Sequence, residues 1–128
     1  MYPFIFEIHK GLANTSTLFF LIIGVWGVYR AIRGQAVDGS YLGAMVIGTL
    51  LFLAPGLLGG AMWLDGGRPG QPWMHVLYGV FAIVFLPFIF AYMKGEDSNQ
   101  AMWVYALANI FLFGIALRSV ELGIQIIP

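Results

Sequence analysis

Residues 69–93 read PGQPWMHVLYGVFAIVFLPFIFAYM and contain no charged side chain. A helix needs about 20 predominantly apolar residues to cross the hydrocarbon core of a bilayer. Three further charge-free stretches of comparable length occur in the 128-residue chain, at 11–29, 39–64 and 98–117. Sixty per cent of the residues are hydrophobic and only 9% are charged, so a soluble domain of this size could not bury all four stretches. The sequence therefore predicts four membrane-spanning helices.

The segments between these stretches predict how the helices connect. Glycine, proline and polar residues, which are turn signals, gather at 34–40, 65–72 and 95–99. Such short links make consecutive helices antiparallel neighbours. We therefore expect one domain over residues 1–128, an all-α, integral membrane up-down-up-down four-helix bundle. Its helices are expected at approximately 8–33, 40–64, 72–94 and 99–125.

Basic residues bear on the orientation of this bundle. They divide evenly between its two sides, with Arg30, Arg33 and Lys94 at the first and third links and Lys10, Arg68 and Arg118 opposite. If Lys10 and Arg118 belong to a ligand site, the positive-inside tendency favours cytoplasmic links. Both termini, Met1 and Pro128, would then share the outer side. The first eight residues carry only the acidic Glu7 and no basic leader, so we expect the first helix to be retained.

Several functional classes are excluded or disfavoured by composition. The chain has no cysteine, which excludes disulfides, thiolate metal sites and c-type haem attachment. Its formal net charge is zero and it has no glycine-rich phosphate loop, so nothing indicates nucleic acid as a partner. No acid, base or metal cluster stands out beyond the histidines, so we do not expect a complete enzyme in this chain alone. Paired ionisable groups typical of ion-coupled transporters are also missing.

The two histidines of the chain, His9 and His75, each stand at the start of an apolar stretch. Because the first and third helices run in the same direction, these side chains should lie at matching depth. Imidazole is a good axial ligand for haem iron, and two from different helices can hold a porphyrin inside a bundle. We therefore predict His9 and His75 as metal ligands. Two alternatives stay open: interfacial histidines without a ligand, or ligands to the magnesium of a chlorophyll-type pigment.

A porphyrin also needs space and partners for its propionates. Small residues near the histidines supply the space, namely Ala13, Ser16, Gly56, Gly59, Gly60, Ala61, Gly79 and Ala82. Gly60 and Gly79 are therefore predicted to border the cofactor. Arg118 is predicted to pair with a propionate, with Lys10 nearby, because arginine binds carboxylates through two parallel hydrogen bonds. The alternative for Arg118 is a surface pair with Glu121 or Glu7.

Three other residues within the apolar stretches are unusual there. Pro55 and Pro87 each remove an amide donor and should bend their helices, and a tolerated kink is the favoured interpretation. Asn109 is expected to bond a neighbouring helix rather than a cofactor.

Two segments resemble a known group of proteins. They are the run His9-Lys10-Gly11-Leu12, followed by the arginines that end the first helix, and residues 70–79, GQPWMHVLYG. Both resemble small, largely uncharacterised four-helix bacterial membrane proteins, which are loosely similar to b-type membrane cytochromes. The resemblance implies a multi-pass protein of the bacterial inner (cytoplasmic) membrane, with haem b bound by His9 and His75. With only two histidines, a second haem on the opposite face is not expected.

These observations favour a membrane b-type haem protein that passes electrons within a respiratory or photosynthetic chain. Its partners would be the lipid bilayer and other membrane subunits or electron carriers, and a quinone could approach through the bilayer. The main alternative is a cofactor-free structural or accessory subunit of a larger membrane complex, or a pigment-binding subunit. Gly24 and Gly27 support it, because small residues allow close packing against a partner.

Overall fold

The computed structural model describes residues 2–64, 66 and 72–124. Within these residues the chain forms four α-helices: α1 (Tyr2–Ile32), α2 (Gly39–Leu64), α3 (Pro72–Tyr92) and α4 (Asn99–Ile124). All four are long and apolar enough to cross a membrane, as the sequence predicts. The helix bounds lie within two residues of expectation, except that α1 begins at Tyr2 rather than at residue 8. Met1, Pro128 and the link at 67–71 fall outside the described residues.

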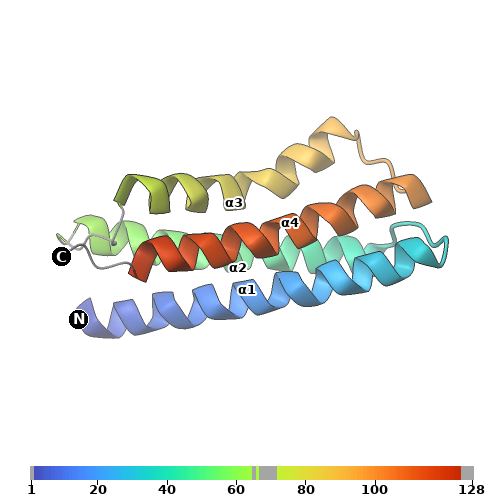
Figure 1. Ribbon diagram of the computed structural model, residues 1–128. Helices are drawn as coiled ribbons and strands as arrows, with labels where there is room; N and C mark the ends of the chain where they lie inside the picture. Colours follow the sequence, from blue (N-terminus) through green and yellow to red (C-terminus); the bar gives the residue numbers. More distant parts are fainter. Residues whose placement is uncertain (1, 65, 67–71, 125–128) are drawn as a thin grey trace.

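Successive helices run in opposite directions, so that α1 begins and α4 ends at the same end of the bundle (Figure 1). The two links at the other end are bonded to each other. The amide of Val37 donates to the carbonyl of Asp97 at 3.0 Å, and Asn99 Nδ2 donates to the carbonyl of Gln35 at 2.8 Å. The links that contain Gln35 and Glu96 therefore lie side by side at one end of the bundle.

The helices form a ring of four. α1 packs against α2 and α4, and α3 packs less closely against the same two helices. Among the described residues the diagonal pairs, α1 with α3 and α2 with α4, do not pack backbone against backbone. Side chains that point inward from α1 and α3 therefore face each other across the middle of the bundle.

Glycines bring α1 close to its two neighbours. An added Cβ at Gly48 in α2 would lie 2.6 Å from the ring of Phe20 in α1, and one at Gly24 would lie 2.6 Å from Ile110 in α4. Gly27 similarly makes room for the Tyr41 hydroxyl. Close helix approach through small residues is typical of membrane bundles. Gly24 and Gly27 thus serve packing within this chain.

A buried polar network links three helices in the same region. Tyr41 in α2 donates its hydroxyl proton to the carbonyl of Ile23 in α1 at 2.7 Å, and Asn109 Nδ2 in α4 donates to the Tyr41 hydroxyl at 2.9 Å. The side chains of Tyr41 and Asn109 are both fully buried. As expected, Asn109 bonds another helix of the bundle, which here is the diagonally placed α2.

α3 is the most peripheral helix. Only 11% of the residues in the apolar segment of α3 are buried inside the bundle, compared with 44% in α4. Its C-terminal half, which contains Pro87, diverges from the other helices in Figure 1.

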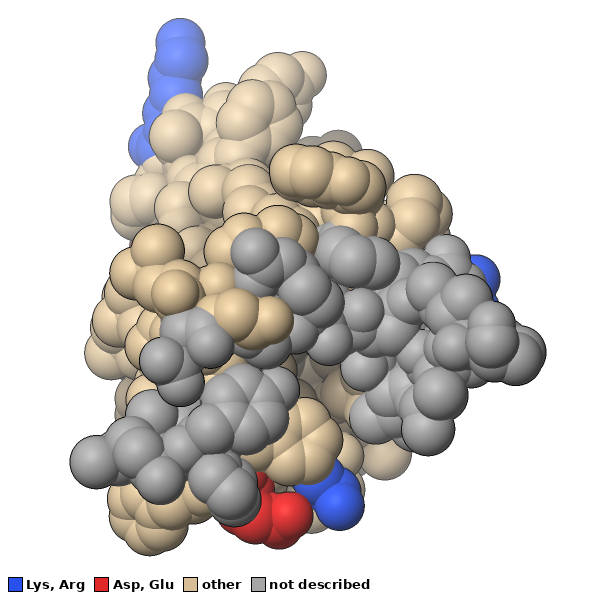
Figure 2. Space-filling view, turned by 90° about the vertical axis from the view of Figure 1, so that its left-hand side faces the viewer, with Lys and Arg blue, Asp and Glu red and all other residues tan. Residues whose placement is uncertain are grey.

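Figure 2 looks onto the end of the bundle where α1 begins, and the described surface there is mostly uncharged, with charged side chains at its margin. Large apolar side chains are also exposed along the helices, for example Ile22, Ile47 and Phe88.

Candidate functional site

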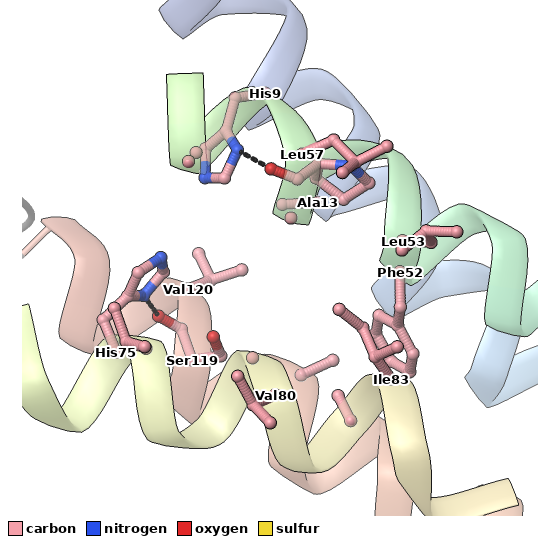
Figure 3. A pocket seen from close by; sticks show the side chains of 18 of the residues that line it. His9, Ala13, Phe52, Leu53, Leu57, His75, Val80, Ile83, Ser119 and Val120 are labelled. Atoms are coloured by element: carbon pink, nitrogen blue, oxygen red, sulfur yellow. Dashed lines mark hydrogen bonds between the residues drawn. The ribbon is translucent and has the colours of Figure 1, made fainter. Parts of the chain in front are cut away.

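A cavity of about 630 Å³ lies between the four helices, in the half of the bundle where α1 begins. Its size is within the range of roughly 300–1,000 Å³ that is usual for small-molecule sites. His9 and His75 stand at one end, and Phe52 and Ile83 stand at the other (Figure 3). The lining between them is mostly apolar and contains several small residues.

The two predicted ligands are brought together by the diagonal arrangement of α1 and α3. The ring centroids of His9 and His75 are 6.1 Å apart, and the ring planes are inclined by 63°. Figure 3 shows the rings facing each other across one end of the cavity. The expectation of matching depth is therefore confirmed.

Each histidine is held by a main-chain carbonyl on a neighbouring helix. His9 Nδ1 lies 2.6 Å from the carbonyl oxygen of Pro55 in α2, and His75 Nδ1 lies 2.8 Å from that of Ser119 in α4. A carbonyl oxygen only accepts hydrogen bonds, so each Nδ1 carries the proton and donates it. In the neutral imidazole the lone pair is then on Nε2. Both Nε2 atoms point into the gap between the rings (Figure 3).

Two imidazoles held in this way could both bind one metal ion. Metal-binding histidines usually donate their other ring N–H to a carboxylate or a backbone carbonyl, as both rings do here. An imidazole nitrogen lies about 2.0–2.1 Å from a bound transition metal, so two rings on opposite sides of one ion have centroids about 6 Å apart. The observed separation of 6.1 Å matches that spacing.

Within the described residues, few other side chains are placed to complete a coordination sphere. Across the described residues, no group of three or more His, Cys, Asp or Glu side chains is placed to hold a metal ion. A bare zinc or copper ion generally takes three or four protein ligands. A metal held by these two imidazoles would have to bring further ligands with it, as the iron of a porphyrin does.

The predicted glycines lie at the cavity as expected, but in different roles. Gly60 and Gly79 line it, and a Cβ at either position would meet no heavy atom within 4 Å. They leave space. A Cβ at Gly59, in contrast, would lie 3.1 Å from His9 Cε1. Gly59 thus permits the close approach of the His9 ring to α2.

Arg118 lies away from the cavity, and its guanidinium is exposed. Its Nη1 atom is 2.7 Å from Oε1 of Glu121, which is the surface pair left open as its alternative. The cationic side chain among the described cavity-lining residues is instead Lys10, with Asn14 one helical turn further along α1. The structure therefore makes Lys10 the candidate partner for an anionic group.

Some site residues could not be recognised from the sequence. Pro55 and Ser119 contribute main-chain carbonyls, which every residue type has, so no side-chain pattern marks them. Trp63 and Trp73 were recognisable only as interfacial aromatics, yet both line the cavity with ring centroids 5.8 Å apart. Pro55 itself signals only a free carbonyl one turn earlier, at Leu51, and not an acceptor at its own carbonyl.

Comparison of the chain with protein-family models, curated proteins and solved structures finds no match.

Proposed function

We propose that this protein is an integral membrane bundle of up-down-up-down topology that binds one haem b between His9 and His75. We further propose that it passes electrons within a respiratory or photosynthetic chain. The observation that carries the proposal is the pair of imidazoles, 6.1 Å apart, with each Nδ1 bonded to a carbonyl and each Nε2 facing the gap.

The exterior supports a bilayer environment. Large apolar side chains are exposed on every helix, for example Leu18, Leu50, Leu77 and Leu107. In water such a surface would drive association, whereas in lipid it is matched to the solvent. The proposed location is the bacterial inner membrane, with the links at Gln35 and Glu96 cytoplasmic and both termini outside.

The cavity supports a macrocyclic ligand. Its walls carry Gly60 and Gly79, where backbone rather than side chain borders the open space. When bound, a haem supplies a one-electron redox centre. The residues of this chain orient the two imidazoles, keep water from the inner face through Phe52 and Ile83, and offer the Lys10 ammonium to a carboxylate.

Two other functions compete with this proposal. A pigment with magnesium would need one of the two histidines, and a cofactor-free subunit would need neither. The cofactor-free subunit receives less support than the sequence suggests. Gly24 and Gly27 pack against Ile110 and Tyr41 of the same chain, so they do not indicate a surface for another subunit. A quinone or a partner subunit could exchange electrons with the proposed centre through the bilayer.

The test is the visible spectrum of the purified protein, oxidised and reduced, with pyridine extraction to identify the chromophore. A redox-sensitive Soret band with a low-spin two-histidine spectrum is expected, and it should be lost in His9→Ala and in His75→Ala. Tyr92→Ala, an exposed ring at the other end of α3, is the control and should keep the spectrum. A colourless wild type, or a spectrum that survives both histidine substitutions, would refute the proposal. Loss in only one variant would replace it with a single-ligand site.

A further inference from the structure

A proline in α2 creates an unusual acceptor beside the His9 contact. Pro55 has no amide hydrogen, so the carbonyl of Leu51, one turn earlier, loses its helical partner. The hydroxyl of Ser16 in α1 lies 2.8 Å from that carbonyl oxygen, and Ser16 is fully buried. Hydroxyl groups on neighbouring helices are a known way to satisfy the carbonyls that proline frees in membranes.

Ser16 shares a face of α1 with His9. The two residues are seven positions apart, which is two helical turns. His9 bonds the carbonyl of Pro55 at 2.6 Å, while Ser16 bonds the carbonyl of Leu51. One face of α1 therefore contacts α2 at two carbonyls that lie one helical turn apart, those of Leu51 and Pro55.

Two carbonyl oxygens lie within hydrogen-bond distance of the Ser16 hydroxyl. Ser16 Oγ is also 2.8 Å from the carbonyl oxygen of Leu12, one turn earlier in its own helix. A hydroxyl has a single proton, so it cannot donate fully to both. Leu12 also lies four residues before the Ser16 amide within α1, whereas the carbonyl of Leu51 has no amide at position 55. The greater need for the proton is therefore at Leu51.

We infer that Ser16 is a positioning residue for His9. By bonding the carbonyl of Leu51, Ser16 holds the turn of α2 before Pro55 against α1 and so fixes where the Pro55 carbonyl lies. That carbonyl sets the rotation of the His9 ring, and with it the 63° inclination to His75. Gly59 lets the His9 ring approach α2, because an added Cβ at this position would lie 3.1 Å from His9 Cε1. The inference rests on the proposed haem ligation.

The test uses Ser16→Ala, Pro55→Ala and the double variant in the haem-loaded protein. The readout is the low-spin electron paramagnetic resonance signal, which depends on the angle between the two imidazole planes. The second readout is the rate of haem transfer to apomyoglobin. Ser16→Ala should shift the signal and speed the transfer about tenfold, since a buried carbonyl loses its partner. The double variant should add little to Pro55→Ala, because that substitution restores the amide that bonds Leu51.

Thr49→Val is the matched control, because among the described residues the Thr49 hydroxyl bonds the carbonyl of Met45 in its own helix, at 3.1 Å. It should leave both readouts unchanged. A wild-type signal and transfer rate in Ser16→Ala would overturn the inference, and so would strictly additive effects of the two substitutions. A wild-type protein without haem would instead defeat the proposed function, so the two failures are distinguishable.

Discussion

Replacement of Gly79 by leucine should evict the cofactor while sparing the bundle. Gly79 lies one turn from His75 on α3 and lines the cavity. A Cβ at this position would meet no heavy atom within 4 Å. The new side chain would therefore enter the open space and would not collide with a neighbouring helix.

The size of the effect follows from the cavity volume. A leucine side chain occupies roughly 100 Å³, about a sixth of the 630 Å³ available. Forcing a ligand into an overpacked site costs about 1–3 kcal/mol. A cost of that size corresponds to about a fivefold to 150-fold rise in the Kd for haem. Gly60→Leu, which enters the same cavity from α2, should behave alike.

The assay measures haem per protein and the size of any membrane complex for each variant. Gly114→Leu is the matched control, because Gly114 in α4 is also helical and open but is not among the cavity-lining residues. It should retain its haem. Full colour in Gly79→Leu and Gly60→Leu, combined with loss of complex assembly, would refute the haem cavity and assign these glycines to subunit packing.

Three further outcomes are expected. The wild type should prefer haem to haem dimethyl ester, which lacks free carboxylates, and Lys10→Gln should remove this preference in a binding titration. Arg118→Gln should keep the preference, because the Arg118 guanidinium is paired with Glu121. The reverse result would return the propionate role to Arg118. Asn109→Ala should destabilise the protein by about 1–3 kcal/mol in denaturation followed by circular dichroism, because the buried Tyr41 hydroxyl loses its donor; an unchanged transition would show that this network adds no stability. Cysteines introduced at Gln35 and Glu96 should be labelled from the same side of the membrane, and labelling from opposite sides would exclude the four-span topology.

The fold was predictable because its signals are long and physically simple. Charge-free stretches such as 69–93 leave few alternatives to an apolar helix, and short links decide the direction of each neighbour. The early start of α1 at Tyr2 was not predicted, because Glu7 and Lys10 interrupt the apolar pattern there although they do not interrupt the helix.

The site was predictable only in part. Matching depth placed His9 and His75 together, since that follows from helix direction alone. Which face each remaining residue presents depends on helix rotation and packing, which sequence spacing specifies poorly. Spacing therefore cannot choose between a propionate and Glu121 as the partner of Arg118, which pairs with Glu121 here. It marks Ser16 only as a small residue, whereas the Ser16 hydroxyl bonds a carbonyl of a second helix.

The use of main-chain acceptors has a consequence for engineering this site. Because the carbonyls of Pro55 and Ser119 orient the two rings, the side chain at position 119 can be exchanged without removing its acceptor. The orientation of the two histidine rings is then determined by the placement of the helices and by a few positions, such as Gly59, that control how closely a ring approaches a backbone. A transplant into another bundle would need to copy the spacing of four helix segments more faithfully than the identities of the residues that line them.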